Sequence, residues 1–248
     1  MGRRWSDPEL KGTLLNTGTV AVGATIGAAA GDRIPDPYKS LVLSGLGLVT
    51  MGLGMRLFFQ SKDVLIVAAA VALGGILGMT IGIQNAIESL AVWMKGRFGG
   101  EGRFVEAIVT PSILFCVGPT TLLGCLQDGL EGKIDLLALK STLDFFAAMF
   151  LAATLGWGVV LTALIVLVFQ GALTLSAKPL RNLASDQALL NEMSAAGGIL
   201  MLAIGLGLLE IKKLPTADYL PAIFLAPAFV ALGRTIKRNR EQEPEKIE

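Results

Sequence analysis

Residues 64–83 read VLIVAAAVALGGILGMTIGI, an uninterrupted run without a charged side chain. An α-helix rises 1.5 Å per residue, so about 20 helical residues cross a hydrocarbon core that is about 30 Å thick. An uncharged run of this length is typical of a transmembrane helix and atypical of the core of a soluble domain. This segment therefore predicts a membrane-spanning helix.

Six more apolar segments surround this one, separated by short charged or turn-rich connectors. Together they predict an all-α, polytopic membrane helix bundle with about seven transmembrane helices. One segment, residues 142–176, would be about 50 Å long as a single helix, too long for one straight span. A break at Gly156-Trp157-Gly158 would divide it, so six or eight spans also fit. The six segments are residues 12–30, 41–59, 104–126, 142–176, 192–209 and 214–233.

The composition excludes several classes of function. Hydrophobic residues make up 53% of the chain, and a net charge of +1 is not that of a nucleic-acid-binding protein. The chain has no His, which removes His-based catalysis and nearly all zinc enzymes. Its two Cys, Cys116 and Cys125, lie in one apolar stretch, so we expect neither a disulfide framework nor a metal centre. With no motif of a known catalytic site, we expect no enzyme activity and no cofactor.

Two sequence blocks recur in the same order along the chain. Residues 19–40 resemble residues 120–141, and residues 72–83 resemble 195–206, which share the pattern Ala-x-Gly-Gly-Ile-Leu. The first copy holds three spans, an odd number, so a second copy would enter the membrane from the opposite side. This predicts an inverted repeat of three-helix units, the plan of many secondary transporters.

The repeat divides the chain into four parts. An amino-terminal extension (residues 1–11) precedes the first membrane repeat (12–100), and the second repeat (101–233) is longer by an extra helical segment. Residues 234–248 form a charged tail, which we expect to be solvated. The chain start also has features of a secretory signal, Arg3-Arg4 before an apolar run, but Asp7 and Glu9 in its flank favour a retained first span.

Polar residues inside apolar segments are the candidates for function. An unpaired polar group in hydrocarbon costs several kcal/mol, so Asn16 and Asp144 must face protein or water. Asn16 fits either a hydrogen bond between helices or a solute ligand. Asp144 fits a functional carboxylate, but a capping box beginning at Ser141, or a pair with Lys140, would explain it without any function.

A second group of candidates surrounds an expected helix break at Gly118-Pro119. Pro119 cannot donate a backbone hydrogen bond, so it frees carbonyl groups that could form an ion site. Gln127 and Asp128 follow this break, and they either belong to such a site or end the helix, with Gly129 as its left-handed cap. Glu192 opens a later span, where it either stabilises the helix N-terminus or binds a solute. Gln170-Gly171 is expected at the membrane interface.

Several motifs recur in fixed order between the apolar runs: Gly12-Thr13-x-x-Asn16, Phe115-Cys116-x-Gly118-Pro119, Gly124-x-x-Gln127-Asp128-Gly129, Lys140-Ser141-x-x-Asp144, Gln170-Gly171 and Gly197-Gly198. In these motifs the chain resembles the YqgA-like family of uncharacterised bacterial inner-membrane proteins, known as domain of unknown function 554. The chain departs from it by its residues ahead of Gly12 and by its charged tail. The resemblance implies a multi-pass protein of the bacterial plasma membrane and names no activity.

These observations favour a transporter or channel for a small ion or polar solute. The expected partners are the lipid bilayer and a small cation, a proton or a polar solute, with a second copy of the chain as a further option. The alternative is a non-transporting membrane scaffold or regulatory protein, for which the abundant small residues on helix faces would form packing surfaces. The candidate binding residues are Asn16, Gln127, Asp128, Lys140, Asp144 and Glu192, with Gly118 and Pro119 as the helix break.

Overall fold

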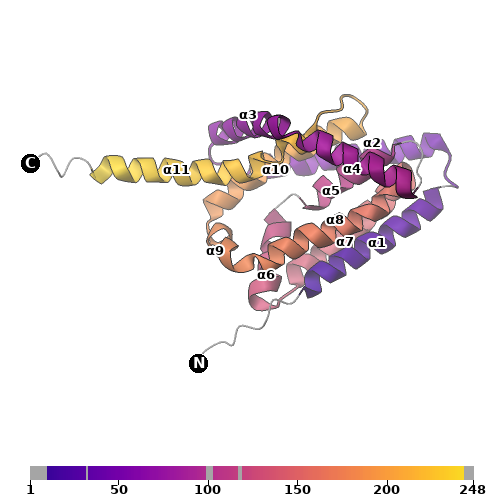
Figure 1. Ribbon diagram of the computed structural model, residues 1–248, viewed down its shortest axis with the longest axis horizontal. Helices are drawn as coiled ribbons and strands as arrows, with labels where there is room; N and C mark the ends of the chain where they lie inside the picture. The colour runs from indigo at the N-terminus through magenta and orange to yellow at the C-terminus, as the bar shows by residue number, and fades with distance from the viewer. Residues whose placement is uncertain (1–9, 32, 99–102, 117–118, 243–248) are drawn as a thin grey trace, which may run out of the picture.

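The computed structural model describes residues 10–31, 33–98, 103–116 and 119–242, and within them it contains helices and no strand. The predicted all-α class is therefore confirmed. Figure 1 shows a bundle elongated along one axis, from which the last helix projects. The elements are α1 (Lys11–Gly31), α2 (Asp36–Phe58), α3 (Val64–Ile81), α4 (Ile83–Phe98), α5 (Phe104–Cys116), α6 (Pro119–Glu131), α7 (Asp135–Leu155), α8 (Gly158–Leu175), α9 (Ala177–Ser185), α10 (Gln187–Leu208), the short 3-10 helix η1 (Thr216–Tyr219) and α11 (Ala222–Gln242).

Seven helices are long and apolar enough to cross a membrane: α1, α2, α3, α7, α8, α10 and the segment Thr216–Ile236. The number agrees with the predicted seven spans, but the helices are not the same seven. Residues 142–176 are divided between α7 and α8, because Gly156 adopts a left-handed φ of 86° that ends α7. Residues 104–126 fall in α5 and α6, which are bent by 63° and would add an eighth span if they cross together.

The predicted break between α5 and α6 is present. α5 ends at Cys116 and α6 begins at Pro119, the position at which a residue without a backbone N–H is best tolerated in a helix. Gly118, the other predicted residue of this break, lies outside the described residues.

Charged side chains outside the apolar segments fix where other helices begin. Asp63 caps α3 by accepting a hydrogen bond from the Leu65 amide (3.0 Å). Asp186 caps α10 by accepting from the amides of Ala188 and Leu189. The Arg234 guanidinium, which pairs with Asp186, holds the pKa of that carboxyl below its ordinary value.

Helices α1 and α7 pack with their backbones in contact. Gly23, Gly27 and Gly31 of α1 face the backbone carbonyls of Phe145, Met149 and Ala153 of α7, respectively. Contacting positions increase together along both helices, so α1 and α7 run parallel. Lipid tails are as apolar as Leu side chains, so burial of apolar surface does not drive helices together in a membrane. Close approach through small residues supplies van der Waals contact and explains the glycine spacing.

A second pair, α2 and α10, packs in the same way but antiparallel. The carbonyls of Gly205 and Gly198 lie against Gly47 and Gly54, so positions increase on one helix as they decrease on the other. α3 and α11 are also antiparallel, because Gly74 faces Ala222 while the later Gly78 faces Asp218.

The helix directions indicate an additional crossing between α3 and α7. α2 is antiparallel to α10, and α3 follows α2 through a short connector, so α3 runs in the direction of α10. α10 in turn runs in the direction of α7, because α8 returns between them. α3 and α7 therefore run the same way, and the chain must cross back between them. Among the described residues the bent pair α5–α6 is the segment that can supply this crossing, which brings the candidate spans to eight.

The inverted repeat is not confirmed. Its better-matched blocks, residues 72–83 and 195–206, lie mainly in α3 and α10, which run in the same direction. Glu192 near the start of α10 binds the connector before α3, and Asp218 beyond α10 accepts a hydrogen bond from Gln84 just after α3. The physical reason is parity: the break at Gly156 adds a crossing between the two blocks, so the second block does not enter inverted.

The outer surface of the bundle is apolar, as expected for helices in contact with lipid. Large apolar side chains point outward, among them Leu65, Met79 and Leu41, which are 79%, 76% and 72% exposed. The interior mixes small residues such as Ala24, Ala148 and Ala152 with larger apolar side chains such as Phe115 and Leu151. This distribution suits a bilayer as solvent, because the outer face needs apolar bulk and the inner face needs close packing.

The α1–α7 contact predicts opposite effects for two alanine substitutions in α1. Gly27→Ala should lower the melting temperature, because a Cβ would collide with the Met149 carbonyl. Gly18→Ala should leave the melting temperature unchanged or raise it. No atom lies within 4 Å of a Cβ at this position, and the higher helix propensity of Ala adds up to about 1 kcal/mol to the free energy of unfolding. Thermal unfolding in detergent measures both. Equal effects at the two positions would contradict backbone contact as the basis of this interface.

Candidate functional site

A buried ion pair lies on α7. Lys140 and Asp144 are one helical turn apart, Lys140 Nζ binds Asp144 Oδ2, and their side chains are only 9% and 10% exposed. Asp144 is nine residues beyond Asp135, or about 14 Å along a helix roughly 31 Å long. The pair therefore extends from about a quarter of the length of α7, at Lys140, to a little short of its middle, at Asp144.

This position corrects the capping interpretation. α7 begins at Asp135, so Ser141 is well inside the helix and its hydroxyl donates to the Leu137 carbonyl (2.6 Å). A capping box at Ser141 is therefore absent, while the predicted pairing of Lys140 with Asp144 is present.

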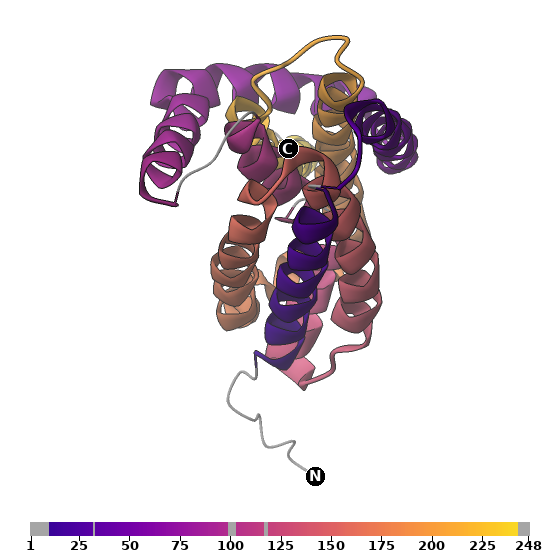
Figure 2. The ribbon, with the colours of Figure 1, turned by 90° about the vertical axis from the view of Figure 1, so that its right-hand side faces the viewer.

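Asn16 brings α1 to the ion pair. It is fully buried, and its Nδ2 donates to Asp144 Oδ2 over 3.0 Å, the same oxygen that Lys140 binds. Lys140 Nζ also lies 5.8 Å from the centroid of the Phe115 ring of α5, within the range of a cation–π interaction. Three predicted residues, Asn16, Lys140 and Asp144, thus form one hydrogen-bonded group. Figure 2 shows α1 lying between α7 and α8.

Helix α8 contributes a polar face that the sequence interpretation missed. Thr162, Gln170 and Thr174 are all fully buried, whereas Gln170 was expected at the interface. The Thr174 hydroxyl lies 3.1 Å from the Thr13 hydroxyl of α1. Helix α8 runs opposite to α1. One turn after Thr13 on α1 and one turn before Thr174 on α8, Asn16 and Gln170 therefore lie at the same level. Spacing at multiples of four in an otherwise apolar helix was the signal for this face.

Several buried polar atoms of α1 and α8 have no hydrogen-bond partner among the described residues. Both ends of the Gln170 amide are in this state, as are Asn16 Oδ1 and the Thr162 hydroxyl. Leaving a buried donor or acceptor unsatisfied costs about 1–3 kcal/mol. A group of such atoms beside a buried ion pair is what a binding site for a small polar species would show before its ligand is added.

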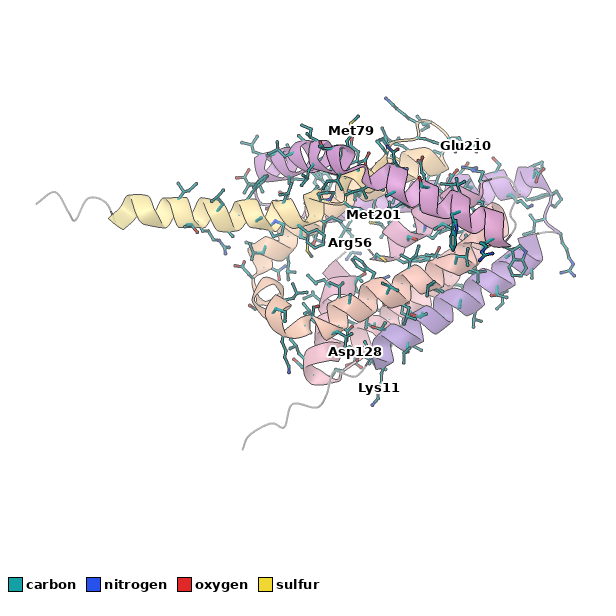
Figure 3. The ribbon with its side chains drawn as sticks, in the orientation of Figure 1. Lys11, Arg56, Met79, Asp128, Met201 and Glu210 are labelled. Atoms are coloured by element: carbon teal, nitrogen blue, oxygen red, sulfur yellow. The ribbon has the colours of Figure 1, made fainter. Side chains whose placement is uncertain are left out.

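Asp128 and Gln127 lie on α6, next to this group. Asp128 Oδ2 accepts a hydrogen bond from the Gly12 amide (2.9 Å), so it binds the first turn of α1, and Figure 3 shows it close to Lys11. Gln127 is partly buried, with its Oε1 unpartnered within the described chain. Gly129 does not cap α6, which continues to Glu131 and is followed by Gly132 with a φ of 67°. Gly129 instead lets the Thr174 carbonyl approach closely.

Glu192 does not belong to this group. It lies in the second turn of α10, and it accepts hydrogen bonds from the Ser61 hydroxyl (2.6 Å) and the amides of Lys62 (2.6 Å) and Asp63 (3.2 Å). Its carboxylate is thus occupied by the connector between α2 and α3. Its role is to join that connector to α10, and its predicted role in solute binding finds no support in the geometry.

The group is not a metal centre of the usual kind. The described residues contain no cluster of three or more His, Cys, Asp or Glu side chains that could hold a metal ion. Cys116 and Cys125 are free thiols. What the group offers is one carboxylate, one ammonium and the two amides of Asn16 and Gln170, which suits a monovalent ion, a proton or a small polar solute.

The chain is similar to proteins whose functions are not known. It matches the family described as "Protein of unknown function (DUF554)" over residues 11–231. It is 30% identical to the "Uncharacterized membrane protein YdfK" of Bacillus subtilis (strain 168), over 88% of this chain and 95% of the relative. It is 28% identical to the "Uncharacterized protein YqgA" of Escherichia coli (strain K12), over 87% of this chain and 94% of the relative. No solved structure matches the chain.

The ion pair predicts a strong coupling between two substitutions. Lys140→Met or Asp144→Leu alone should destabilise the protein by about 3–5 kcal/mol, because each leaves an uncompensated buried charge. The double variant should recover most of this loss, because two apolar side chains replace both charges. A matched control is Lys133→Met, which removes a pair with Glu131 whose side chains are 60% and 47% exposed and should change little. Unfolding in detergent measures all four variants, and additive losses would contradict a direct, buried pair.

Proposed function

We propose a transport function for this chain, which belongs to the family of proteins of unknown function called DUF554 and is an integral membrane protein. The proposed activity is that of a transporter or channel for a small ion or polar solute, with a monovalent cation or a proton favoured. The proposed location is the bacterial inner membrane. Asn16, Lys140, Asp144 and Gln170 form the proposed binding site.

The observation that carries the proposal is the set of unpartnered polar atoms beside the ion pair. A purely structural interior would be more stable with an apolar side chain at Gln170, and Asn16 also keeps an unpartnered Oδ1, since buried polar groups without partners are costly. Retaining them inside membrane-spanning helices, each five residues from a helix end, is consistent with a ligand that completes their hydrogen bonds or coordination. The favoured ligand is a cation, because Asp144, Asn16 and Gln170 all offer oxygen atoms.

Charge balance suggests how binding would be coupled. The Lys140–Asp144 pair is neutral as a whole, and a cation that bound Asp144 would leave the buried site with a net positive charge. Loss of one proton from the Lys140 ammonium restores neutrality, and that proton leaves to water. In this scheme one monovalent cation enters the site as one proton leaves it. The amides of Asn16 and Gln170 each have an oxygen that can bind the cation and an NH2 group that can donate a hydrogen bond when the cation is absent.

One observation favours the alternative hypothesis, a non-transporting membrane scaffold. Gly45 and Gly52 lie on a face of α2 where no atom comes within 4 Å of a Cβ position, so a small-residue surface faces outward. Such a surface fits a partner helix or a second copy of the chain. It says nothing against a transport site elsewhere, and the flux measurement below separates the two functions.

Cation–proton exchange should depend on Asp144. In proteoliposomes loaded with a pH-sensitive dye, an inward Na⁺ or K⁺ gradient should raise the internal pH in the wild type. Asp144→Asn should abolish this signal, because the amide cannot balance a bound cation. Asp135→Asn, the same change at the exposed first residue of α7, should leave it intact. A wild-type protein with no flux for either cation would favour the scaffold function, and an unaffected Asp144→Asn would remove this residue from the site.

Gln170 should show opposite effects on stability and transport. Gln170→Leu should raise the free energy of unfolding by about 1–3 kcal/mol, since it removes unsatisfied buried groups, and should reduce flux. The control is Thr174→Val on the same face, which should lower stability because it leaves the Thr13 hydroxyl without its partner. A destabilised Gln170→Leu variant would indicate that the amide is already satisfied and is structural.

A further inference from the structure

Two adjoining cavities are lined by none of the four proposed binding residues. The first has a volume of about 580 Å³ and is lined by charged side chains that include Glu88, Arg103, Glu106 and Lys213. The second has a volume of about 340 Å³ and lies between α5, α8, α10 and α11. Val109 lines both, so the two cavities share a wall.

The charged cavity lies at the ends of the spans. Arg103 immediately precedes α5, and Lys213 is in the connector between α10 and η1. Figure 3 shows the neighbouring Glu210 at the end of α10. Ends of membrane-spanning helices lie at the level of lipid headgroups. This cavity is therefore placed where a headgroup would meet the protein.

The apolar cavity descends from that level into the bundle. It follows α5 from Ile108 to Cys116, about 12 Å of helix, and reaches Met193 near the opposite end of α10. Among the described residues that line it, all but Ser112 and Cys116 have hydrocarbon or thioether side chains. Phe224, also in the lining, is 60% exposed on the outer surface of α11, so the cavity lies next to the surrounding lipid.

The charges in the first cavity are of both signs and close together. Arg103 Nε and Lys213 Nζ each donate to Glu106 Oε2, at 2.8 and 2.9 Å. With Glu88, the lining holds two cationic and two anionic side chains, so its charges sum to zero. Such a lining selects against a ligand of large net charge and complements one that carries both signs on one small group.

We propose that the joined cavities bind one phospholipid with a zwitterionic headgroup. One acyl chain fills the apolar cavity, the phosphate lies toward Arg103 and Lys213, and the ammonium lies toward Glu88. The apolar part of the cavity disfavours a bare ion, for which desolvation without partners is too costly. The lining includes none of the residues of the proposed ion site, and the proposal does not depend on the transport function.

The test uses two photoreactive lipids with the same diazirine-labelled acyl chain, one a phosphatidylethanolamine and one a phosphatidylglycerol. The wild-type protein in nanodiscs should be labelled on peptides containing residues 104–116, several-fold more by the phosphatidylethanolamine probe. Ser112→Phe, which fills the apolar cavity, should remove this labelling while leaving labelling of the exposed face of α3 unchanged. Equal labelling by both probes, or labelling that survives Ser112→Phe, would overturn the proposal.

A surface variant keeps the test decisive if Ser112→Phe does not fold. Lys213→Ala should reduce labelling by the phosphatidylethanolamine probe, because it removes a phosphate contact. Lys212→Ala, which removes the adjacent exposed lysine that does not line the cavity, should have no effect. Equal effects of the two substitutions would contradict headgroup recognition. The proteoliposome flux assay with Asp144→Asn tests the transport function separately. Failure of one proposal therefore does not decide the other.

Discussion

Backbone contact between α1 and α7 is the constraint on which the rest of this structure depends. Gly23, Gly27 and Gly31 bring the two helices so close that Asn16 reaches Asp144 across the interface. The same contact fixes the parallel direction of the two helices, and that direction requires the bent α5–α6 pair to return the chain across the bilayer. The helix arrangement and the polar group thus both depend on the glycine face of α1, because larger side chains there would keep α1 and α7 apart.

The tightly packed interior also contains an ion pair and several polar side chains that add little to its stability. A buried ion pair contributes little net stability, because removing both charges from water cancels most of their attraction. Asn16 and Gln170 add unsatisfied amide atoms to that balance. Stability alone therefore does not account for these residues, and this is the reason for proposing a solute site there. Asp128 and Glu192, in contrast, use their carboxylates to hold other segments in place.

Local sequence signals predicted much of this architecture. The apolar segments, the break at Gly156 and the pairing of Lys140 with Asp144 depend on residues close together in the chain, so periodicity and composition revealed them. The parity of the two repeated blocks, in contrast, depends on how many times the chain crosses between them, which one extra break changes. The role of Glu192 depends on a connector 130 residues away, and Gln170 was misplaced because its burial is set by α1 packing on α8.

The hydrogen bonds of Glu192 have a mechanical consequence. They tie the connector after α2 to α10, and α11 packs on α3 and α10, so these helices form one packed body. Helices α1 and the bent pair pack with α7 and α8 as another. The apolar cavity lies on the seam between these bodies, with α5 and α8 on one side and α10 and α11 on the other. The acyl chain that we propose for this cavity would fill the seam with fluid hydrocarbon, so that it could widen or narrow without unpacking either body, as rocking of the proposed transporter between two access states would require.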